Sequence, residues 1–207
     1  MNDDAAFQRI TGVSRETMDR LQIYERLLQR WNARINLISK STEHSIWTRH
    51  MLDSAQLLKL APVGWKSWAD LGSGGGFPGA VIAMIAAEQC PNATVTLVES
   101  DQRKAAFLRA VGRETGIDMT VLVQRAETLA PLAVDVLSAR ALAQLPTLLG
   151  LAKRHLSSDG AALFPKGSKA SSEISQALET WRFRCETHIS QTDKEAVVLK
   201  IGDIERV

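Results

Sequence analysis

Residues 70–79, Asp-Leu-Gly-Ser-Gly-Gly-Gly-Phe-Pro-Gly, hold five of the thirteen glycines of the chain and decide its fold. The apolar segment 67–69 before them is typical of the end of a buried strand, and the apolar run 80–87 after them favours a helix. A strand that turns through glycines into a helix directs backbone N–H groups at a ligand above the turn. Pro78 suits the first turn of such a helix, because its missing N–H is no loss there. The stretch therefore predicts a ligand-binding turn between a strand and a helix.

Three classes of ligand-binding loop use such a turn, and the residue types separate them. A phosphate-binding P-loop ends in Gly-Lys-Ser/Thr, but no lysine lies between Lys66 and Lys104. A dinucleotide-binding loop has the pattern Gly-x-Gly-x-x-Gly, and Phe77 stands where its last glycine would be. The spacing Asp-x-Gly-x-Gly-x-Gly fits, and it resembles the first motif of Rossmann-like S-adenosylmethionine (SAM) methyltransferases. It is formed by Asp70, Gly72, Gly74 and Gly76.

Composition narrows the class of protein. A chain of 207 residues can hold one α/β domain with an extension, and a hydrophobic content of 45% is ordinary for a globular protein. No apolar run approaches the roughly 20 residues of a membrane span, and the acidic start 1–4 does not look like a signal peptide. Cys90 and Cys185 match no metal-ligand spacing, so they are expected to be reduced thiols and no metal is predicted. These observations predict a cytoplasmic protein, with a monomer as the default.

Positive charge is concentrated near the N-terminus, although the formal net charge is only +2. Eight Lys or Arg residues stand against four acids between residues 9 and 49, whereas residues 61–207 are balanced. A basic element on a neutral body can contact nucleic-acid phosphates. An ordinary solvated helix face would give the same counts, so the charge pattern leaves both interpretations open.

Residues 1–63 are predicted to form a helical extension. Ser14 can cap a helix whose apolar positions recur at steps of three and four. These positions are Met18, Leu21, Tyr24, Leu28, Trp31 and Ile35. A second helix is expected to begin at Ser41 or Thr42 and to end before Pro62. The apolar stripe must be buried, and the domain that follows offers the nearest surface.

From residue 64 to residue 207, strands and helices alternate, which predicts a parallel sheet. Strands are expected at 67–71, 93–98, 119–123, 134–137, 161–164, 184–189 and 196–201. Helices are expected at 80–88, 101–115, 145–156 and 171–181. The last two strands are close enough along the chain for an antiparallel hairpin. The predicted fold class is α/β, a seven-stranded, mostly parallel Rossmann-like sheet of the class I SAM-dependent methyltransferase type.

The carboxyl ends of four strands deliver residues to the edge where such sheets bind ligands. The first strand delivers the glycine loop. The second delivers Glu99, whose carboxylate can accept bonds from both hydroxyls of a ribose. The third delivers Ala126 and Glu127, which can read an adenine, and the fourth delivers Arg140, which can bind a carboxylate or a phosphate. A plain structural role, such as a helix cap or a salt bridge, is the alternative for each charged residue.

Sequence blocks carry a more specific resemblance. They occur in order at 36–39, 48–54, 70–79, 97–100, 104–108, 125–127, 138–141 and 165–167. In this order they resemble the RsmG (GidB) family, the guanine-N7 methyltransferases of bacterial small-subunit rRNA. The Gly-Phe-Pro-Gly ending of the glycine loop and the block Arg-His-x-x-Asp-Ser at 49–54 separate this family from methyltransferases at large. Beyond Gly167 the resemblance is loose, so nothing is carried over to that segment.

The resemblance implies an enzyme that transfers a methyl group from SAM to N7 of a guanine in the decoding region of 16S rRNA. Its partner would be free 16S rRNA or the small ribosomal subunit. The SAM contacts of the family correspond to Gly72, Phe77, Ala126, Glu127 and Arg140, and Gly74 and Glu99 are added from the loop motif and the second strand. Guanine N7 has a lone pair and no proton, so the reaction needs alignment and no general base. No catalytic acid–base pair is therefore assigned, although His50 and Asp53 are available.

Basic side chains are the candidates for RNA contacts: Arg30, Arg34, Arg49, His50 and Lys166. Lys166, which follows the fifth strand, suits a phosphate or guanine O6. For His50, packing within the helical extension is an equal alternative. Two other classes of function stay open. A methyltransferase acting on a small molecule would turn over without RNA, and a non-catalytic RNA-binding factor would not bind SAM.

Overall fold

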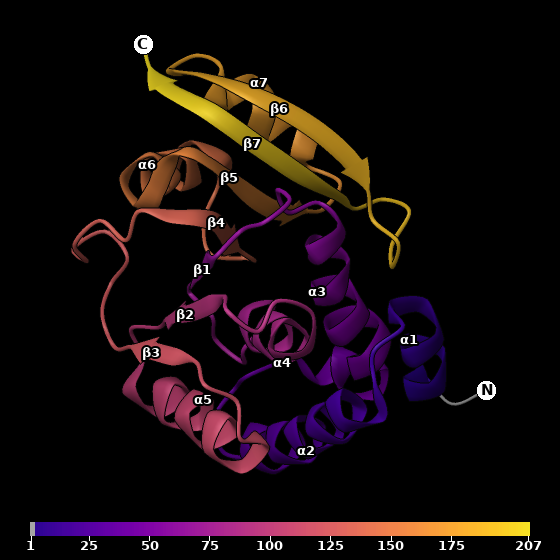
Figure 1. Cartoon of the computed structure of the whole chain (residues 1–207). Helices are drawn as coiled ribbons and strands as arrows, with labels where there is room; N and C mark the ends of the chain where they lie inside the picture. Colours follow the sequence, from indigo (N-terminus) through magenta and orange to yellow (C-terminus); the bar gives the residue numbers. More distant parts are fainter. Residues whose placement is uncertain (1–2) are drawn as a thin grey trace.

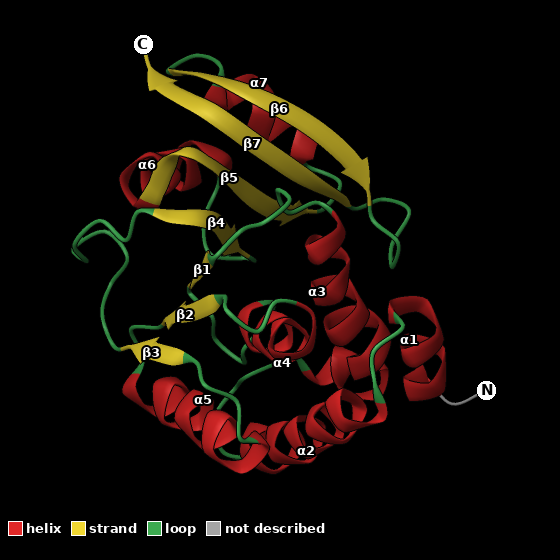
Figure 2. Cartoon of the chain, viewed as in Figure 1, coloured by secondary structure: helices red, strands yellow, loops and turns green. Residues whose placement is uncertain are grey.

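The computed structural model describes residues 3–207, and a seven-stranded sheet forms its centre (Figure 1 and Figure 2). The strands are β1 (Ser67–Leu71), β2 (Thr94–Val98), β3 (Thr120–Leu122), β4 (Val134–Ala139), β5 (Leu156–Lys166), β6 (Trp181–Ile189) and β7 (Val197–Arg206). Their order in the sheet is β3-β2-β1-β4-β5-β7-β6. The first five strands pair in parallel, and β7 runs antiparallel to both β5 and β6. The predicted parallel sheet with a closing antiparallel hairpin is confirmed.

Helices cover both faces of the sheet, and each face has its own apolar core. On one face α4 (Gly79–Gln89) and α5 (Gln102–Thr115) pack around Trp68 of β1. On the other face α6 (Leu145–His155) and α7 (Ala170–Ala177) pack around the neighbouring Ala69. The side chains of these consecutive residues point into opposite cores, because side chains alternate between the two faces of a strand. Within residues 3–207, no helix combines the length and apolarity needed to cross a bilayer.

The N-terminal helices α1 (Asp3–Thr11) and α2 (Arg15–Asn32) complete the first of these cores. Ser14 caps α2 as predicted, since its hydroxyl accepts a bond from the backbone N–H of Thr17 at 3.2 Å. Four positions of the predicted stripe are buried: Met18, Leu21, Tyr24 and Leu28. Glu88 of α4 accepts a bond from the Thr17 hydroxyl at 2.6 Å, so the start of α2 is tied to the sheet domain.

We propose that the extension ends at residue 63, at the turn where Val63 is fully exposed and Gly64 has a φ of +77°. The first two residues of the predicted extension 1–63 lie outside the described residues.

The prediction of one continuous second helix beginning at Ser41 or Thr42 is wrong. The chain instead makes four short helical pieces: η1 (Lys40–Ser45, a 3₁₀ helix), η2 (Trp47–Leu52, a π-helix), α3 (Asp53–Ala55) and η3 (Gln56–Lys59, a 3₁₀ helix). Side-chain hydroxyls bond within these pieces: that of Thr42 pairs with His50 Nε2 at 2.9 Å, and that of Ser54 donates to the His50 carbonyl at 2.6 Å. A bond from a serine hydroxyl to the carbonyl four residues earlier often bends a helix, and π-helical turns are frequent at functional sites.

Several boundaries in the second half also differ from the prediction. β5 begins at Leu156, immediately after α6, whereas the sequence predicts a strand from Ala161. The pairing of β4 with β5 shifts register between its two ends, and Gly160 lies in the irregular part, so it does not end an element. α7 ends at Ala177, and Trp181 begins β6 instead of ending the helix. Its ring packs beside Gly150 of α6 and under the guanidinium of Arg206.

Candidate functional site

The glycine loop joins β1 to α4 as predicted, and its own hydrogen bonds fix its shape. The backbone N–H groups of Gly72 and Ser73 both donate to the carbonyl of Val98, at 2.8 and 3.1 Å. The N–H of Gly74 donates to Oε2 of Glu99 at 2.8 Å. These N–H groups, which the sequence suggested would face a ligand, are therefore bonded within the protein. The loop offers a preformed surface at the carboxyl ends of β1 and β2, with the Glu99 carboxylate at its rim.

Asp70 explains why the motif begins with an acid. Its side chain is fully buried; Oδ1 accepts from the Ser138 hydroxyl of β4 at 2.8 Å, and Oδ2 accepts from the N–H of Gly79 at 3.2 Å. Burial raises the pKa of Asp70 to about 6, against the opposing effect of these hydrogen bonds. The carboxylate thus joins β1 and β4 to the first residue of α4. Its role is to hold the loop.

Three predicted cofactor residues come together in a small cavity beside the loop. Gly72, Ala126 and Glu127 line about 70 Å³, and the other lining residues include Leu142 from the turn after β4. Leu142 lies directly over the loop, since a Cβ on Gly72 would be 2.6 Å from its Cδ1. The carbonyl of Ala126 is held by His155, whose Nε2 donates to it at 2.8 Å. The loop after β3 is therefore anchored to the last turn of α6.

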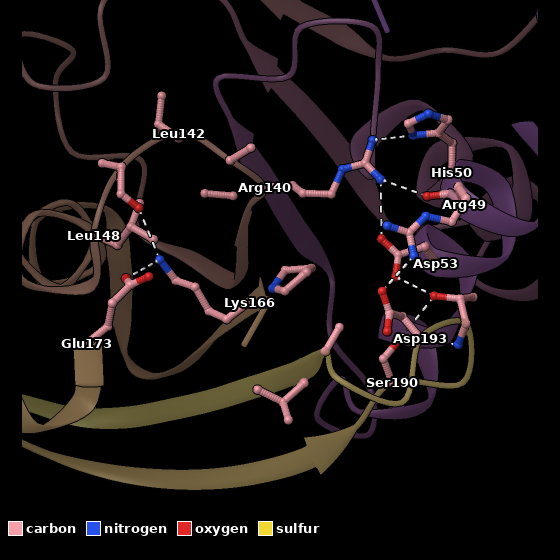
Figure 3. Close-up of a pocket in the computed structure, with 18 of the residues that line it drawn as sticks. Arg49, His50, Asp53, Arg140, Leu142, Leu148, Lys166, Glu173, Ser190 and Asp193 are labelled. Carbon is pink, nitrogen blue, oxygen red and sulfur yellow. Dashed lines mark hydrogen bonds and ion pairs between the residues drawn. The ribbon is translucent and has the colours of Figure 1, made fainter. Parts of the chain in front are cut away.

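Arg140 links the glycine loop to the helical extension (Figure 3). Its Nη1 donates to Oδ2 of Asp53 and to the carbonyl of Arg49, both at 3.2 Å. Its Nη2 lies 2.9 Å from Nδ1 of His50. The guanidinium also stands over the ring of the buried Phe77, 5.2 Å from its centroid. Two residues predicted to bind the cofactor, Phe77 and Arg140, are thus in one cluster with the Arg-His-x-x-Asp block.

The protonation state of His50 follows from this cluster. Burial, with the nearby charges of Arg140 and Arg49, lowers the pKa of His50 to about 4, so its ring is neutral at pH 7. Arg140 can only donate, so Nδ1 accepts and the proton lies on Nε2, which donates to the Thr42 hydroxyl. The ring also stacks on Phe77, with centroids 4.8 Å apart. His50 therefore orients Arg140 and is not poised to exchange protons near neutral pH.

The depressed pKa predicts a pH-dependent stability. The unfolded chain binds a proton at His50 near pH 6.5 and the folded protein only near pH 4, so the contribution of His50 is complete above pH 6.5 and is lost as the pH falls toward 4. The unfolding free energy of the wild type minus that of His50→Asn is expected to fall by about 3 kcal/mol across this interval. Urea titrations of both proteins measure it, and the opposite contribution of Asp70 cancels in the difference. A difference that stays constant between pH 7 and pH 4.5 would contradict the assignment.

A second cavity, of about 580 Å³, collects three of the five RNA-binding candidates, Arg49, His50 and Lys166, together with Arg140 (Figure 3). Arg49 donates to Asp193 at 2.7 Å, and Lys166 donates to Glu173 at 2.7 Å, so both cations are paired with carboxylates of the cavity wall.

Arg30 and Arg34 are not part of this cavity. Arg30 is exposed on α2, and Arg34 borders a separate groove with Arg103 and Lys104 at the start of α5. The structure therefore separates the RNA-binding candidates into two places.

Sequence reasoning named Asp53 without giving it a role, and it missed Glu173, Asp193 and Leu142. The cation that Asp53 binds is Arg140, 87 residues further along the chain, so no local spacing indicated that role. Leu142, Glu173 and Asp193 carried no signal either, since only the fold brings their segments to the cavities. Within residues 3–207, no group of three or more His, Cys, Asp or Glu side chains could hold a metal ion.

Comparisons with known proteins agree on one relationship. The profile of the GidB family, described as rRNA small subunit methyltransferase G, matches residues 17–198. A ribosomal RNA small subunit methyltransferase G from Ruegeria sp. strain TM1040 is 49% identical over 195 residues, which are 94% of this chain and 95% of the relative. A protein of the same name from Cereibacter sphaeroides strain ATCC 17025 is 50% identical over 205 residues, 99% of both chains.

Solved structures share the fold at much lower identity. A TehB-like SAM-dependent methyltransferase from Corynebacterium glutamicum superposes with a TM-score of 0.58 at 15% identity, over 87% of this chain and 98% of its own. A putative SAM-dependent methyltransferase from Methanococcus maripaludis gives a TM-score of 0.60 at 8% identity, over 78% of this chain and 89% of its own. At such identities the likeness concerns the fold, and it confirms the predicted class I methyltransferase architecture.

Proposed function

The chain belongs to the rRNA small subunit methyltransferase G family, and from this premise we propose that it transfers the methyl group of SAM to N7 of a guanine in 16S rRNA. One observation carries the proposal. The small cavity of the predicted cofactor residues and the large cavity with basic walls share Leu142 and lie next to each other. With the adenine of SAM at the first cavity and its carboxylate at Arg140, its methyl group would lie near that boundary and could meet a base in the second cavity.

The residues predicted to bind the cofactor fit SAM, from Glu99 beside the glycine loop, through the first cavity, to Arg140 in the wall of the second. Each oxygen of Glu99 accepts one backbone N–H, from Gly74 and Asp101, and keeps a lone pair for a ribose hydroxyl. The anchored segment of Ala126 and Glu127 suits the adenine, and the Arg140 guanidinium suits a carboxylate. When bound, SAM supplies an electrophilic methyl group on a sulfonium.

The residues of the second cavity suit a base that needs no deprotonation. N7 of guanine attacks with its own lone pair, so the protein must fix the purine and leave N7 free. The neutral, doubly hydrogen-bonded His50 agrees with a site that needs no general base. Lys166 contributes a cation for O6, and Arg49 at the rim contributes one for phosphate. The guanine must be turned out of its RNA stack to enter.

Methyl transfer from labelled SAM to undermodified small subunits and to stripped 16S rRNA tests the proposal. The expected product is 7-methylguanosine, identified by nucleoside mass spectrometry, and the preferred substrate shows whether free rRNA or the subunit is recognised. Label in another nucleoside would refute the proposed N7 position. Turnover of a small molecule without RNA, or failure to bind SAM by calorimetry, would favour the two other classes of function.

A further inference from the structure

Lys166 and Glu173 form a largely buried ion pair in the wall of the large cavity, on the side away from Arg140 and His50 (Figure 3). Their side chains are only 9% and 19% exposed. Nζ of Lys166 donates to Oε2 of Glu173 at 2.7 Å and to the carbonyl of Ala143 at 3.0 Å. The same Oε2 accepts the backbone N–H of Leu145, the first residue of α6, at 2.8 Å. β5, α6 and α7 thus hold the pair in a fixed orientation.

The pair has unused hydrogen-bonding capacity of a definite kind. A lysine ammonium has three donors, and Lys166 uses two of them within residues 3–207. A carboxylate offers about four acceptor positions, two on each oxygen. Both bonds to Glu173 fall on Oε2, and Oε1 has no partner among the described residues. One donor and two acceptor positions therefore remain side by side at the cavity wall.

The free donor of Lys166 and the two free acceptor positions of Glu173 match the Watson–Crick edge of guanine. The edge of guanine presents an acceptor at O6 and then two donors, N1–H and the 2-amino group, whereas adenine presents a donor and then an acceptor. We propose that Glu173 accepts from N1–H and the 2-amino group while Lys166 donates to O6, so that Glu173 determines the specificity for guanine. The inference rests on the proposed function and names the group that selects its base. N7 is on the opposite side of the purine from these donors, so this pose turns it away from Glu173 and toward Arg140.

Glu173→Gln tests the role with little change of shape. The amide keeps one oxygen for Leu145 and Lys166 but presents an N–H₂ where the base needs an acceptor. Small subunits are reconstituted with guanosine or with inosine, which lacks the 2-amino group, at the methylated position. The wild type is expected to prefer guanosine in kcat/KM by about tenfold or more. Glu173→Gln is expected to lose activity on guanosine and to bring the preference close to one, with SAM affinity unchanged.

Glu179→Gln provides the matched control, because Glu179 is exposed just beyond α7 and lines no part of the cavity. It should keep the wild-type preference. If Glu173→Gln loses activity but keeps the full guanosine preference, Glu173 only supports α6 and the inference is wrong. If the wild type itself makes no 7-methylguanosine, the proposed function fails first, and that result is seen without any variant.

Discussion

Gly79→Ala is expected to lower the free energy of unfolding by about 3 kcal/mol and to abolish SAM binding. A Cβ at this position would lie 2.7 Å from Cβ of Asp70 and 2.2 Å from Cδ2 of Leu97. Leu97 is a fully buried side chain, and Cβ of Asp70 is joined directly to the backbone of β1, so neither contact is easily relieved. Moving α4 away would also break the hydrogen bond from the Gly79 N–H to the buried Asp70 carboxylate.

Gly150→Ala is the control for this variant, because Gly150 lies inside α6 and an added Cβ would make an ordinary 3.7 Å contact with Trp181. It should stabilise the protein by about 0.5–1 kcal/mol, since alanine loses less backbone entropy than glycine in a helix. Urea unfolding measures both variants, and calorimetry measures SAM binding. If Gly79→Ala were as stable as the wild type, the close packing of α4 on β1 would not be what requires this glycine.

The parts of the fold that the sequence predicted are those in which local pattern and global structure agree. The glycine loop needs an extended residue before it and a helix after it, and Asp70 to Gly79 contain both signals. Asp101 and Gly116 cap α5 at its two ends, as their residue types indicate. In these segments the residue types determine the conformation of their near neighbours along the chain, so the sequence alone is sufficient to predict the local structure.

The parts that the sequence did not predict depend on contacts between distant segments. The helical pieces of residues 40–59 hold Arg140, which is far along the chain, through the Arg49 carbonyl, Asp53 and His50. Lys166 is predicted from the sequence to contact a phosphate or guanine O6, but the sequence does not show that the fold pairs it with Glu173 and the carbonyl of Ala143. A charge count near the N-terminus did not distinguish Arg49, which lines the cavity, from Arg30, which does not. Such roles depend on where the fold places a side chain relative to the carboxyl edge of the sheet. The periodicity of the sequence does not give that position.

Arg140→Lys and Arg140→Ala are each expected to lower kcat/KM by on the order of 100-fold, since a small misplacement of reacting groups has effects of this size. Arg140 contacts the Arg49 carbonyl, the Asp53 carboxylate and His50 Nδ1 with one planar group. A lysine keeps the charge, but it cannot make this set of bonds or stack on Phe77 as a guanidinium does. Arg140→Ala leaves the carboxylate of Asp53 without its cation, and Arg140→Lys cannot bond Asp53, the Arg49 carbonyl and His50 together, so in both variants the extension is no longer held in place on the glycine loop.

Arg184→Ala is the matched control, because Arg184 makes two surface ion pairs on β6, is 58% exposed and lies outside the large cavity. Exposed pairs contribute little to stability, and this variant should keep wild-type activity. Calorimetry with SAM separates the two possible origins of the loss in the Arg140 variants. Weakened SAM binding by tenfold or more places the Arg140 guanidinium at the cofactor, whereas unchanged binding with lost transfer places it at the base. Wild-type transfer by Arg140→Lys would show that charge alone suffices and that the bonds from Arg140 to Asp53 and His50 are incidental.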